Sequence, residues 1–306
     1  MHKYTEKKQK NQALKKFISS YVSEASLELI EDCNTFMMFV GDETMTKTKQ
    51  HKGNSCKNRF CPICAWRKAK KDALALSVMM EYIKAEHQKE FIFLTLTAPN
   101  VPAEELNDEI KDYNKAFQRL MQRQEVKRVV KGYARKLEIT YNQERNDYHP
   151  HFHVLIAVNK SYFNNKDYYI THDRWLALWQ EVTRNPLITQ VNVKKVRQNN
   201  KKEVAEIAKY GAKDSDYLVD QDIFGVFYKS LKGKQIIVYS GFFKEAMKLF
   251  KAGDLDKFKE LDITRYVYAI MYNWGQSEYI KSECRLLTEN EQKEINRQLI
   301  DDMEVE

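Results

Sequence analysis

Three histidines alternate along a segment that has the composition of a β-strand. They belong to the run HPHFHVLIAV at residues 149–158. Side chains two residues apart on a strand project to the same face, so His149, His151 and His153 share one face and apolar side chains line the other. Imidazole is the commonest metal-ligating side chain, and this row therefore predicts a metal site on a β-sheet. A row of partly solvated strand histidines is the alternative.

The strand that precedes the histidines predicts an oxygen ligand beside them. Residues 135–141 alternate between polar and apolar side chains, and the polar loop 142–147 joins them to the histidines as an antiparallel hairpin. If the hairpin buries its apolar faces together, Glu138 lies on the histidine side. Two imidazoles and one carboxylate would leave positions open on a divalent ion, Mg²⁺ or Mn²⁺, that polarises a phosphate. Alternatively, Glu138 is a surface residue that is paired with Lys136.

Cysteines in the first quarter of the chain have the spacing of a structural zinc site. Residues 56–64 (CKNRFCPIC) combine C-x4-C with C-x2-C, and the second spacing is typical of zinc knuckles. The three cysteines of this run are Cys56, Cys61 and Cys64. Tetrahedral zinc needs a fourth ligand, for which Cys33 is the first candidate and His51 the second, whereas Cys284 lies in a segment predicted to be helical. Inert buried thiols are the alternative.

The charge of the chain favours an anionic partner. The net charge is +8 and the pI is near 9.0, while 18 Tyr and 15 Phe offer stacking surfaces for bases. Basic residues surround the cysteines, and those predicted to contact DNA are Arg59, Arg67 and Lys68. No apolar run approaches the roughly 18 residues that a membrane span needs. Five cysteines at uneven spacing suit a reducing compartment, so we expect a cytoplasmic protein without membrane contact.

Strands and helices alternate along the chain and are joined partly by hairpins. This order predicts an α+β fold, with an antiparallel sheet that carries helices on one face. The predicted helices include residues 66–85, 104–130 and 202–212, and the predicted strands are 91–98, 135–141, 149–158, 191–193 and 235–239. We predict three regions: a basic N-terminal region with the zinc module (1–86), a central sheet domain (87–241) and a mainly helical C-terminal region (242–306).

A glutamate and a tyrosine lie one turn apart on the helix predicted for residues 202–212. Glu206 and Tyr210 are four residues apart and face the same way. A phenol has a pKa of about 10, so it needs a nearby metal or lysine to attack phosphorus at neutral pH. A carboxylate one turn away can act as general base for a second nucleophile. Taken alone, such a pair is typical of an ordinary solvated helix face.

Four motifs in this order resemble the rolling-circle replication initiators (Rep proteins) of small Gram-positive plasmids. The resemblance is to the branch of that family that carries a Cys-rich N-terminal segment. The motifs are CKNRFCPICAWRKAKK at residues 56–71, FIFLTLTAP at 91–99, HPHFHVLIAV at 149–158 and EVAEIAKYGAK at 203–213. The resemblance extends over the chain from about Cys33 to Tyr239.

This resemblance implies a nuclease of the HUH type, named for two histidines around a hydrophobic residue, here His151, Phe152 and His153. Members share a ferredoxin-like or RNA-recognition-like antiparallel sheet with the metal on its central strands, which we expect in residues 87–241. They nick one strand of an origin, typically at an extruded hairpin. By analogy, Tyr210 attacks the phosphate and keeps the 5′ end as a phosphotyrosine. The released 3′-OH serves a host polymerase, and Glu206 activates water for the terminating cleavage.

The roles of neighbouring residues stay open at this point. Lys209 or Lys213 would contact phosphate or lower the pKa of the tyrosine, unless both are solvated helix lysines. Tyr217 is a candidate second nucleophile, although Gly211 weakens the helix that would connect it to Tyr210. If Glu206 is not the base for termination, Glu203 is the next candidate.

Two other readings of the function fit parts of the sequence. A relaxase or a single-strand transposase is a related HUH enzyme, but relaxases usually carry the tyrosine before the histidines, and the Cys segment and chain length suit a transposase poorly. A non-catalytic DNA-binding regulator would hold zinc at the cysteines and use the histidines structurally. The leading hypothesis predicts as partners the plasmid origin, as a single-stranded hairpin, and a host helicase and polymerase.

Overall fold

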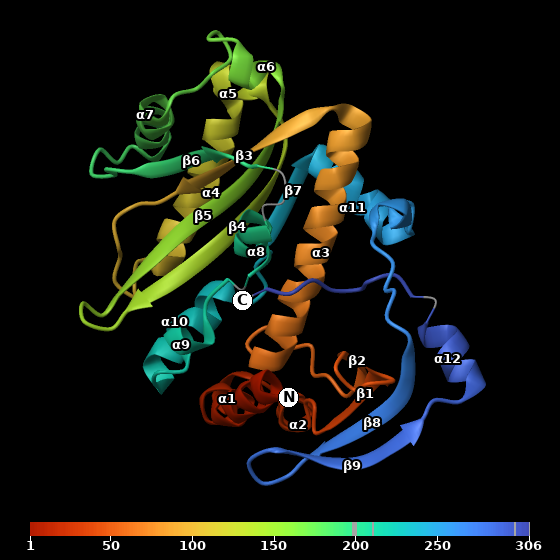
Figure 1. Ribbon diagram of the computed structural model, residues 1–306. Coiled ribbons are helices and arrows are strands. Elements are labelled where there is room, and N and C mark those ends of the chain that lie inside the picture. The colour runs from red at the N-terminus through yellow and green to blue at the C-terminus, as the bar shows by residue number, and fades with distance from the viewer. Residues whose placement is uncertain (198–200, 210, 297, 306) are drawn as a thin grey trace. The chain divides into compact units, whose positions relative to one another are not determined.

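The computed structural model (Figure 1) describes residues 1–197, 201–209, 211–296 and 298–305, without side-chain placement for residues 201 and 202. Its internal contacts divide the chain into two compact units. The first joins Met1–Lys71 to Lys259–Met303, and the second comprises Asp72–Phe258 with the last residues of the chain. Each unit combines helices with an antiparallel sheet, which confirms the predicted α+β class.

The second unit is built on a five-stranded antiparallel sheet in the order β6-β3-β5-β4-β7. Its strands are β3 (Lys89–Leu96), β4 (Val130–Asn142), β5 (Asp147–Asn159), β6 (Val191–Lys195) and β7 (Ile237–Gly241). The two longest strands, β4 and β5, form the predicted hairpin. Its register sets His151 opposite Glu138 and His153 opposite Lys136. Directly opposed residues point to the same face of a sheet, so all four side chains share the histidine face.

Helices lie on both faces of this sheet, rather than on one face as predicted (Figure 1). Tyr113 and Phe117 of α4 pack their rings against Phe152 of β5, so α4 covers the apolar face. On the histidine face, α8 contacts β4 and β5. The helices of this unit are the later part of α3 (Pro62–His87), α4 (Leu106–Gln122), α5 (Gln124–Val129), α6 (Ser161–Asn164), α7 (His172–Thr183), α8 (Lys201–Ala208), α9 (Asp214–Tyr217), α10 (Gln221–Leu231), α11 (Phe242–Ala252) and the short 3-10 turn Asp256–Phe258.

The first unit is built on a four-stranded antiparallel sheet in the order β2-β1-β8-β9. Its strands are β1 (Phe36–Asp42), β2 (Thr48–Gly53), β8 (Tyr266–Trp274) and β9 (Tyr279–Leu286). Its helices are α1 (His2–Ile18), the 3-10 turn Ser19–Tyr21, α2 (Glu24–Glu31), the start of α3 and α12 (Glu289–Ile295). Val40 packs with Ile295 of α12 on one face, and Phe39 meets Tyr4 of α1 on the other, so both faces contribute to the core.

The prediction that residues 242–306 are mainly helical is wrong for their central part. β8 and β9 form a hairpin there, and β8 pairs with β1 from the other end of the chain. The run YVYAIMYNW of β8 is rich in residues that favour strands. Its stabilising partner is remote in sequence, however, so local periodicity did not reveal the pairing. β1 and β2 were not predicted either, and the compact units divide the chain differently from the three predicted regions.

Two predicted helices end earlier than their sequence patterns suggest. The helix predicted over 104–130 is interrupted at Arg123, whose ψ of 133° is not helical. α8 ends at Ala208, and the main-chain oxygen of Gly211 accepts a hydrogen bond from the amide of Ile139 in β4 (2.8 Å). The chain after α8 therefore pairs with the sheet instead of continuing the helix. Within the described ranges, no helix combines the length and the apolar character needed to cross a membrane.

Candidate functional site

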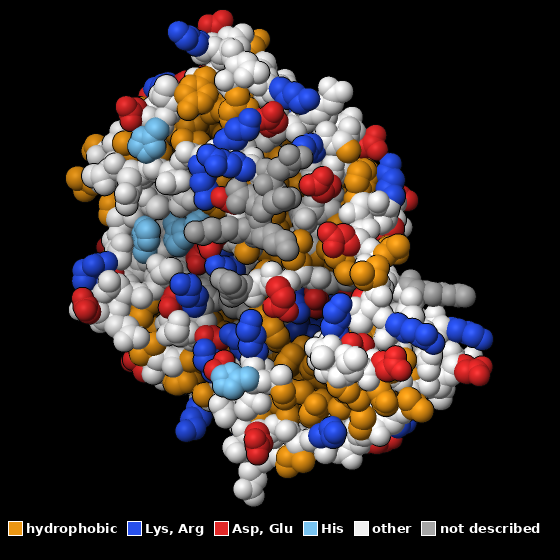
Figure 2. Space-filling model, in the orientation of Figure 1, with side chains coloured by type: hydrophobic (Ala, Val, Ile, Leu, Met, Phe, Trp, Pro, Cys, Tyr) orange, Lys and Arg blue, Asp and Glu red, His pale blue; other side chains and the backbone are white. Residues whose placement is uncertain are grey.

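Glu138, His151 and His153 converge on the sheet face that α8 contacts. The Nε2 atom of His153 lies 3.1 Å from Oε2 of Glu138, and Nε2 of His151 lies 3.7 Å from the same oxygen. The potential ligand atoms of the three side chains lie within 4.8 Å of one another. Figure 2 shows histidine side chains reaching the surface where β5 runs in Figure 1. The structure thus brings together the three side chains that the hairpin pattern places on one face.

Hydrogen bonds orient both imidazoles of this group. Nδ1 of His151 lies 3.2 Å from the main-chain oxygen of His149, and Nδ1 of His153 lies 3.2 Å from Oγ1 of Thr95. A main-chain carbonyl only accepts, so Nδ1 of His151 donates and its Nε2 keeps a free lone pair. Hydrogen bonds of this kind set the tautomer and the ring orientation of metal-binding histidines.

The donor set fits a divalent cation. Ligands about 2.1 Å from an octahedral metal lie about 3.0 Å from their neighbours. The 3.1 Å between His153 and Glu138 is close to that spacing. Two nitrogen donors and one oxygen donor are compatible with several divalent ions, and three protein ligands leave coordination positions for a phosphate oxygen.

The electrostatics of the group favour the protonation states that bind metal. Burial raises the pKa of Glu138, but its hydrogen bond with His153 and the charge of Lys136 outweigh burial and hold that pKa well below its usual range. Burial lowers the pKa of His151 to about 4, against the opposing effect of the Glu138 charge. A charged carboxylate and a neutral imidazole are the ligand forms that a metal requires.

The alternative role for Glu138, a surface residue paired with Lys136, is half correct. Nζ of Lys136 does pair with Oε2 of Glu138 at 2.7 Å. The Glu138 side chain is only 8% exposed, however, so it is not a surface residue. Burial of Lys136 beside it was not predicted, because alternation alone cannot distinguish a solvated face from one that a helix covers.

The third histidine of the row lies outside the metal group. The His149 ring stacks on the His151 ring, with centroids 5.1 Å apart, but its nitrogens do not belong to the cluster of potential ligands. Burial lowers the pKa of His149, against the opposing effect of a hydrogen bond with the main chain of Ala98. The structure therefore leaves His151 and His153 as the candidate ligands of the row.

Glu206 of α8 lies at the edge of the metal group. Its Oε2 is 3.9 Å from Nε2 of His153, and its Oε1 accepts a hydrogen bond from Nζ of Lys209 at 2.7 Å. The Glu206 side chain is 30% exposed. The Glu203 side chain is only 5% exposed and pairs with Lys194 at 2.6 Å. Of the two glutamates, Glu206 is the one that water and a phosphate can reach.

Tyr210 lies outside the described residues, but both of its sequence neighbours are held near the metal group. Lys209 contacts Glu206, as described above. Gly211 is hydrogen-bonded to Ile139, the residue that follows Glu138 in β4.

Tyr217 and Lys213, the other candidates from this part of the chain, differ in accessibility. Tyr217 is 4% exposed in α9, and its ring packs against Phe224 and Phe227. Lys213 is exposed at the start of that helix. The hydroxyl of Tyr217, in its core position, is poorly placed to attack DNA, whereas Lys213 can contact a phosphate.

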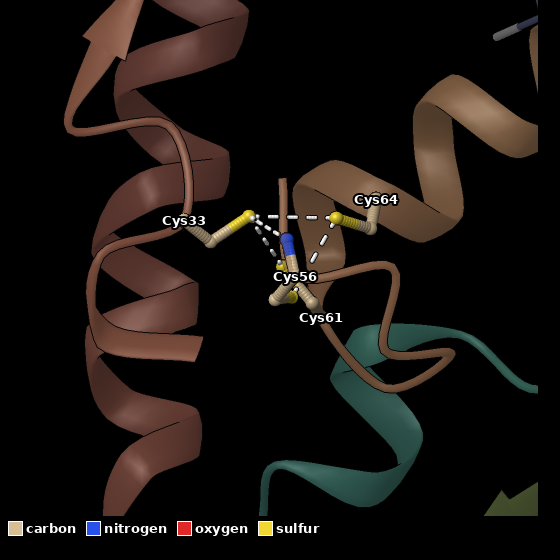
Figure 3. A group of neighbouring side chains, drawn as sticks. All are labelled: Cys33, Cys56, Cys61 and Cys64. Carbon is tan, nitrogen blue, oxygen red and sulfur yellow. Dashed lines mark hydrogen bonds between the residues drawn. The ribbon is translucent and has the colours of Figure 1, made fainter. Parts of the chain in front are cut away.

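Four cysteines come together in the first unit (Figure 3). The sulfur of Cys33 lies 3.4 Å from that of Cys64 and 3.7 Å from that of Cys61, and Cys56 lies 3.6 Å from Cys64. In a tetrahedral site with Zn–S bonds of about 2.3 Å, sulfurs lie about 3.8 Å apart. The four thiols therefore fit zinc. Neither His51 nor the exposed Cys284 belongs to the group.

Polar side chains from α1 and the following segments surround the sulfurs. Asn11 donates through Nδ2 to Sγ of Cys61 (3.4 Å), and Asn34 donates to Sγ of Cys33 (3.3 Å). Lys8 is fully buried, and its Nζ donates to the main-chain oxygen of Cys33 at 2.7 Å. Such donors and a buried cation favour thiolates, the form that binds zinc. The sequence predicts only that Lys8 belongs to the basic N-terminal region, and it gives no sign of this role, because nothing local links residue 8 to the cysteines.

The basic side chains near the cysteines differ in exposure. Arg59 and Lys68 are exposed and Arg67 is half-buried, so a polyanion can reach all three. Lys70 is nearly buried and pairs with Asp302 at 3.2 Å, which gives it a structural role. Figure 2 shows basic side chains interspersed with acidic ones over the face that it draws, rather than one uniformly positive surface.

Comparison with known proteins finds relatives over most of the chain. A family model described as replication protein matches residues 47–280. A Protein rep from Staphylococcus aureus is 62% identical over 221 residues, which cover 72% of this chain and 96% of that protein. A Protein rep from Streptococcus pneumoniae is 34% identical, with 76% and 74% covered, and one from Bacillus amyloliquefaciens is 32% identical, with 88% of each covered. No solved structure matches significantly.

Proposed function

The chain belongs to the replication protein family, and on this premise we propose that it initiates the rolling-circle replication of a plasmid. Its substrate would be one strand of the plasmid origin, presented as a single-stranded hairpin, which it nicks and joins covalently to itself. The convergence of Glu138, His151 and His153 beside Glu206 is the observation that best supports this proposal. A DNA-binding regulator would use these histidines only structurally and would not need a solvent-accessible carboxylate beside them.

Tyr210 would act as the nucleophile. Its phenolic oxygen bonds to phosphorus while the bond from phosphorus to the 3′ oxygen breaks, so the 5′ end stays on the tyrosine. The 3′ oxygen takes up one proton and leaves as a hydroxyl, which balances the proton that the phenol gives up. A Mg²⁺ or Mn²⁺ ion held by Glu138, His151 and His153 would polarise the scissile phosphate. Lys209 would add positive charge beside the phosphate.

Glu206 would serve as the general base for termination. Burial raises the pKa of Glu206, but the hydrogen bond from Lys209 and its charge lower that pKa by more. The pKa of Glu206 therefore lies below its ordinary value. The carboxylate is therefore charged at neutral pH and can accept a proton from water. That water would carry out the terminating cleavage of the origin strand, and the 3′-OH released there would attack the phosphotyrosine, which joins the strand ends and frees Tyr210.

The first unit would contribute DNA binding. We propose that zinc bound by the four cysteines stabilises its fold and that Arg59, Arg67 and Lys68 contact phosphates, as Lys213 does in the second unit. The free 3′-OH would then be extended by a host polymerase, after a host helicase opens the duplex. Such a role places the protein in the cytoplasm, where its plasmid replicates.

The direct test is covalent cleavage of the origin strand. The full chain is incubated with Mn²⁺ and a 3′-labelled single strand that carries the origin of the plasmid that encodes it. We expect a labelled protein–DNA adduct on a denaturing gel, and no adduct in excess EDTA. Absence of an adduct with both Mn²⁺ and Mg²⁺ would favour the zinc-containing regulator instead. An adduct formed only with transposon ends or with a conjugative transfer origin would favour the related HUH enzymes.

Replacing Glu206 with alanine should separate initiation from termination. We expect E206A to form the adduct but to release it about 10²- to 10⁴-fold more slowly, the usual contribution of a general base. The measurement is the decay of the purified adduct with a strand that allows termination. E206Q, which keeps the side-chain shape and an oxygen for Lys209, should show the same defect. Normal release by both variants would move the base to another residue, with Glu203 next to be tested.

A further inference from the structure

The hairpin register buries a lysine inside the candidate metal site. Lys136 of β4 lies opposite His153 of β5, and its side chain is 0% exposed. Nζ donates one hydrogen bond to Oε2 of Glu138 at 2.7 Å and another to the main-chain oxygen of Glu206 at 2.9 Å. One ammonium group thus connects a candidate metal ligand on the sheet with the helix α8.

Burial of this lysine is not explained by packing. An ammonium group without solvent is unfavourable unless its partners replace its hydration, and an apolar side chain of similar volume often stabilises a core better. Glu138 supplies the compensating charge and the Glu206 carbonyl supplies a second acceptor. Because no surface of Lys136 reaches solvent, it is not placed to bind DNA as the exposed Lys213 is.

The two acceptors of Lys136 belong to the two parts of the site that must act together. Oε2 of Glu138 is also the oxygen that lies 3.1 Å from His153 and 3.7 Å from His151. Glu206, whose carbonyl takes the other hydrogen bond, carries the carboxylate that lies 3.9 Å from His153. A shift of the ammonium group would therefore move a metal ligand and α8 relative to each other.

We propose that Lys136 is a positioning residue that couples the metal group to α8. It holds the Glu138 carboxylate and the end of α8 at a fixed separation, so that Glu206, and the chain that leads to Tyr210, stay aligned with a phosphate on the metal. This inference rests on the proposed function, since it assigns Lys136 a task in that reaction. Alignment of this kind matters because small displacements of reacting groups cause large losses of rate.

The first experiment compares the full chain with K136M, which keeps the length of the side chain but has no hydrogen to donate. We expect cleavage at saturating Mn²⁺ to fall about 10- to 100-fold, the usual effect of removing a group that orients a metal ligand. The Mn²⁺ concentration for half-maximal rate should change little by comparison. The melting temperature, measured with Mn²⁺ so that the metal compensates the charge of Glu138 in place of Lys136, should also change little. A cleavage rate equal to that of the wild type would overturn the proposal. A decrease in melting temperature that by itself accounts for the lost activity would also overturn the proposal, because that result indicates a purely structural lysine.

The matched control is K131M, which removes a lysine from the same strand. Lys131 donates to the main-chain oxygen of Arg128 and has no contact with the metal group. This variant should cleave at the wild-type rate.

A second measurement does not depend on cleavage or on the stability of a variant. Hydrogen exchange of the α8 amides in the wild-type chain should slow when Mn²⁺ is added without DNA, because a fixed Glu138 fixes Lys136 and hence the Glu206 carbonyl. Exchange that does not respond to bound Mn²⁺ would contradict the coupling. Failure of the proposed function has a different signature: the wild-type chain would form no adduct, while exchange in α8 would still report whether Lys136 links it to a metal ligand.

Discussion

Replacing Tyr210 with phenylalanine is expected to abolish the covalent adduct between the protein and its origin strand. Phenylalanine keeps the ring but has no oxygen to bond to phosphorus, so no phosphotyrosine can form. Removal of an enzymatic nucleophile lowers the rate by about 10⁶-fold, which for a gel assay is complete loss. The measurement is the 3′-labelled adduct after incubation with Mn²⁺. Binding of the uncleaved strand in EDTA should match the wild type, which verifies that Y210F is folded.

Tyr217 provides the matched control for this experiment. Its ring lies in the core against Phe224 and Phe227, so Y217F keeps most of the packing and should form the adduct at the wild-type rate. Adduct formation by Y210F together with its loss in Y217F would transfer the role of nucleophile to Tyr217. Adduct formation by both single variants, and its loss only in the double variant, would indicate two tyrosines that substitute for each other.

Loss of zinc is expected to unfold much of the first unit. Binding of structural zinc contributes about 10–16 kcal/mol to folding in zinc-finger peptides. Removal of one ligand should therefore exceed the effect of an ordinary core substitution. We expect C61S to retain less than one zinc per chain, and its hydrogen exchange in residues 33–64 to rise towards that of an unfolded chain. Metal analysis and exchange of the intact protein measure both effects, and prolonged treatment of the wild type with a strong chelator should reproduce them.

Cys284 provides the matched control for zinc. It is an exposed residue of β9 that does not belong to the cysteine group, so C284S should hold one zinc and show wild-type exchange. A C61S protein with full zinc content and unchanged exchange would contradict a four-cysteine site. If His51→Ala lost zinc while Cys33→Ser kept it, the fourth ligand would be His51 rather than Cys33.

Much of the candidate site in the second unit follows from local pattern. Alternation along two strands and the short loop between them placed Glu138, His151 and His153 on one face. The observed register sets Glu138 directly opposite His151. This prediction succeeds because a hairpin is a local structure, whose pairing depends on a turn and on which faces are apolar. The spacing of Cys61 and Cys64 is also a local feature, so the sequence shows it directly.

In the first unit, the strands and the buried lysine whose partners are distant in sequence were not found. β1 and β8 stabilise each other as neighbours in the first sheet, yet they lie near opposite ends of the chain, and residues 242–306 were predicted as mainly helical. Lys8 was predicted only as part of the basic N-terminal region, although it is buried beside Cys33. The strand β8 contains no signal for its partner, because strand propensity depends strongly on what packs against the strand. Nothing in the helix that contains Lys8 points to the cysteines.

The sequence by itself determined which side chains share a face of the histidine strand, since the two-residue period is a property of any extended backbone. It also determined the chemistry available there: two imidazoles, a carboxylate and, further along, a tyrosine. Only the tertiary structure decided that α8 covers this face, that Lys136 is buried between Glu138 and the Glu206 carbonyl, and that Cys33 joins the other three cysteines. These outcomes depend on which distant segments the whole fold brings into contact. No local window of the chain contains that information.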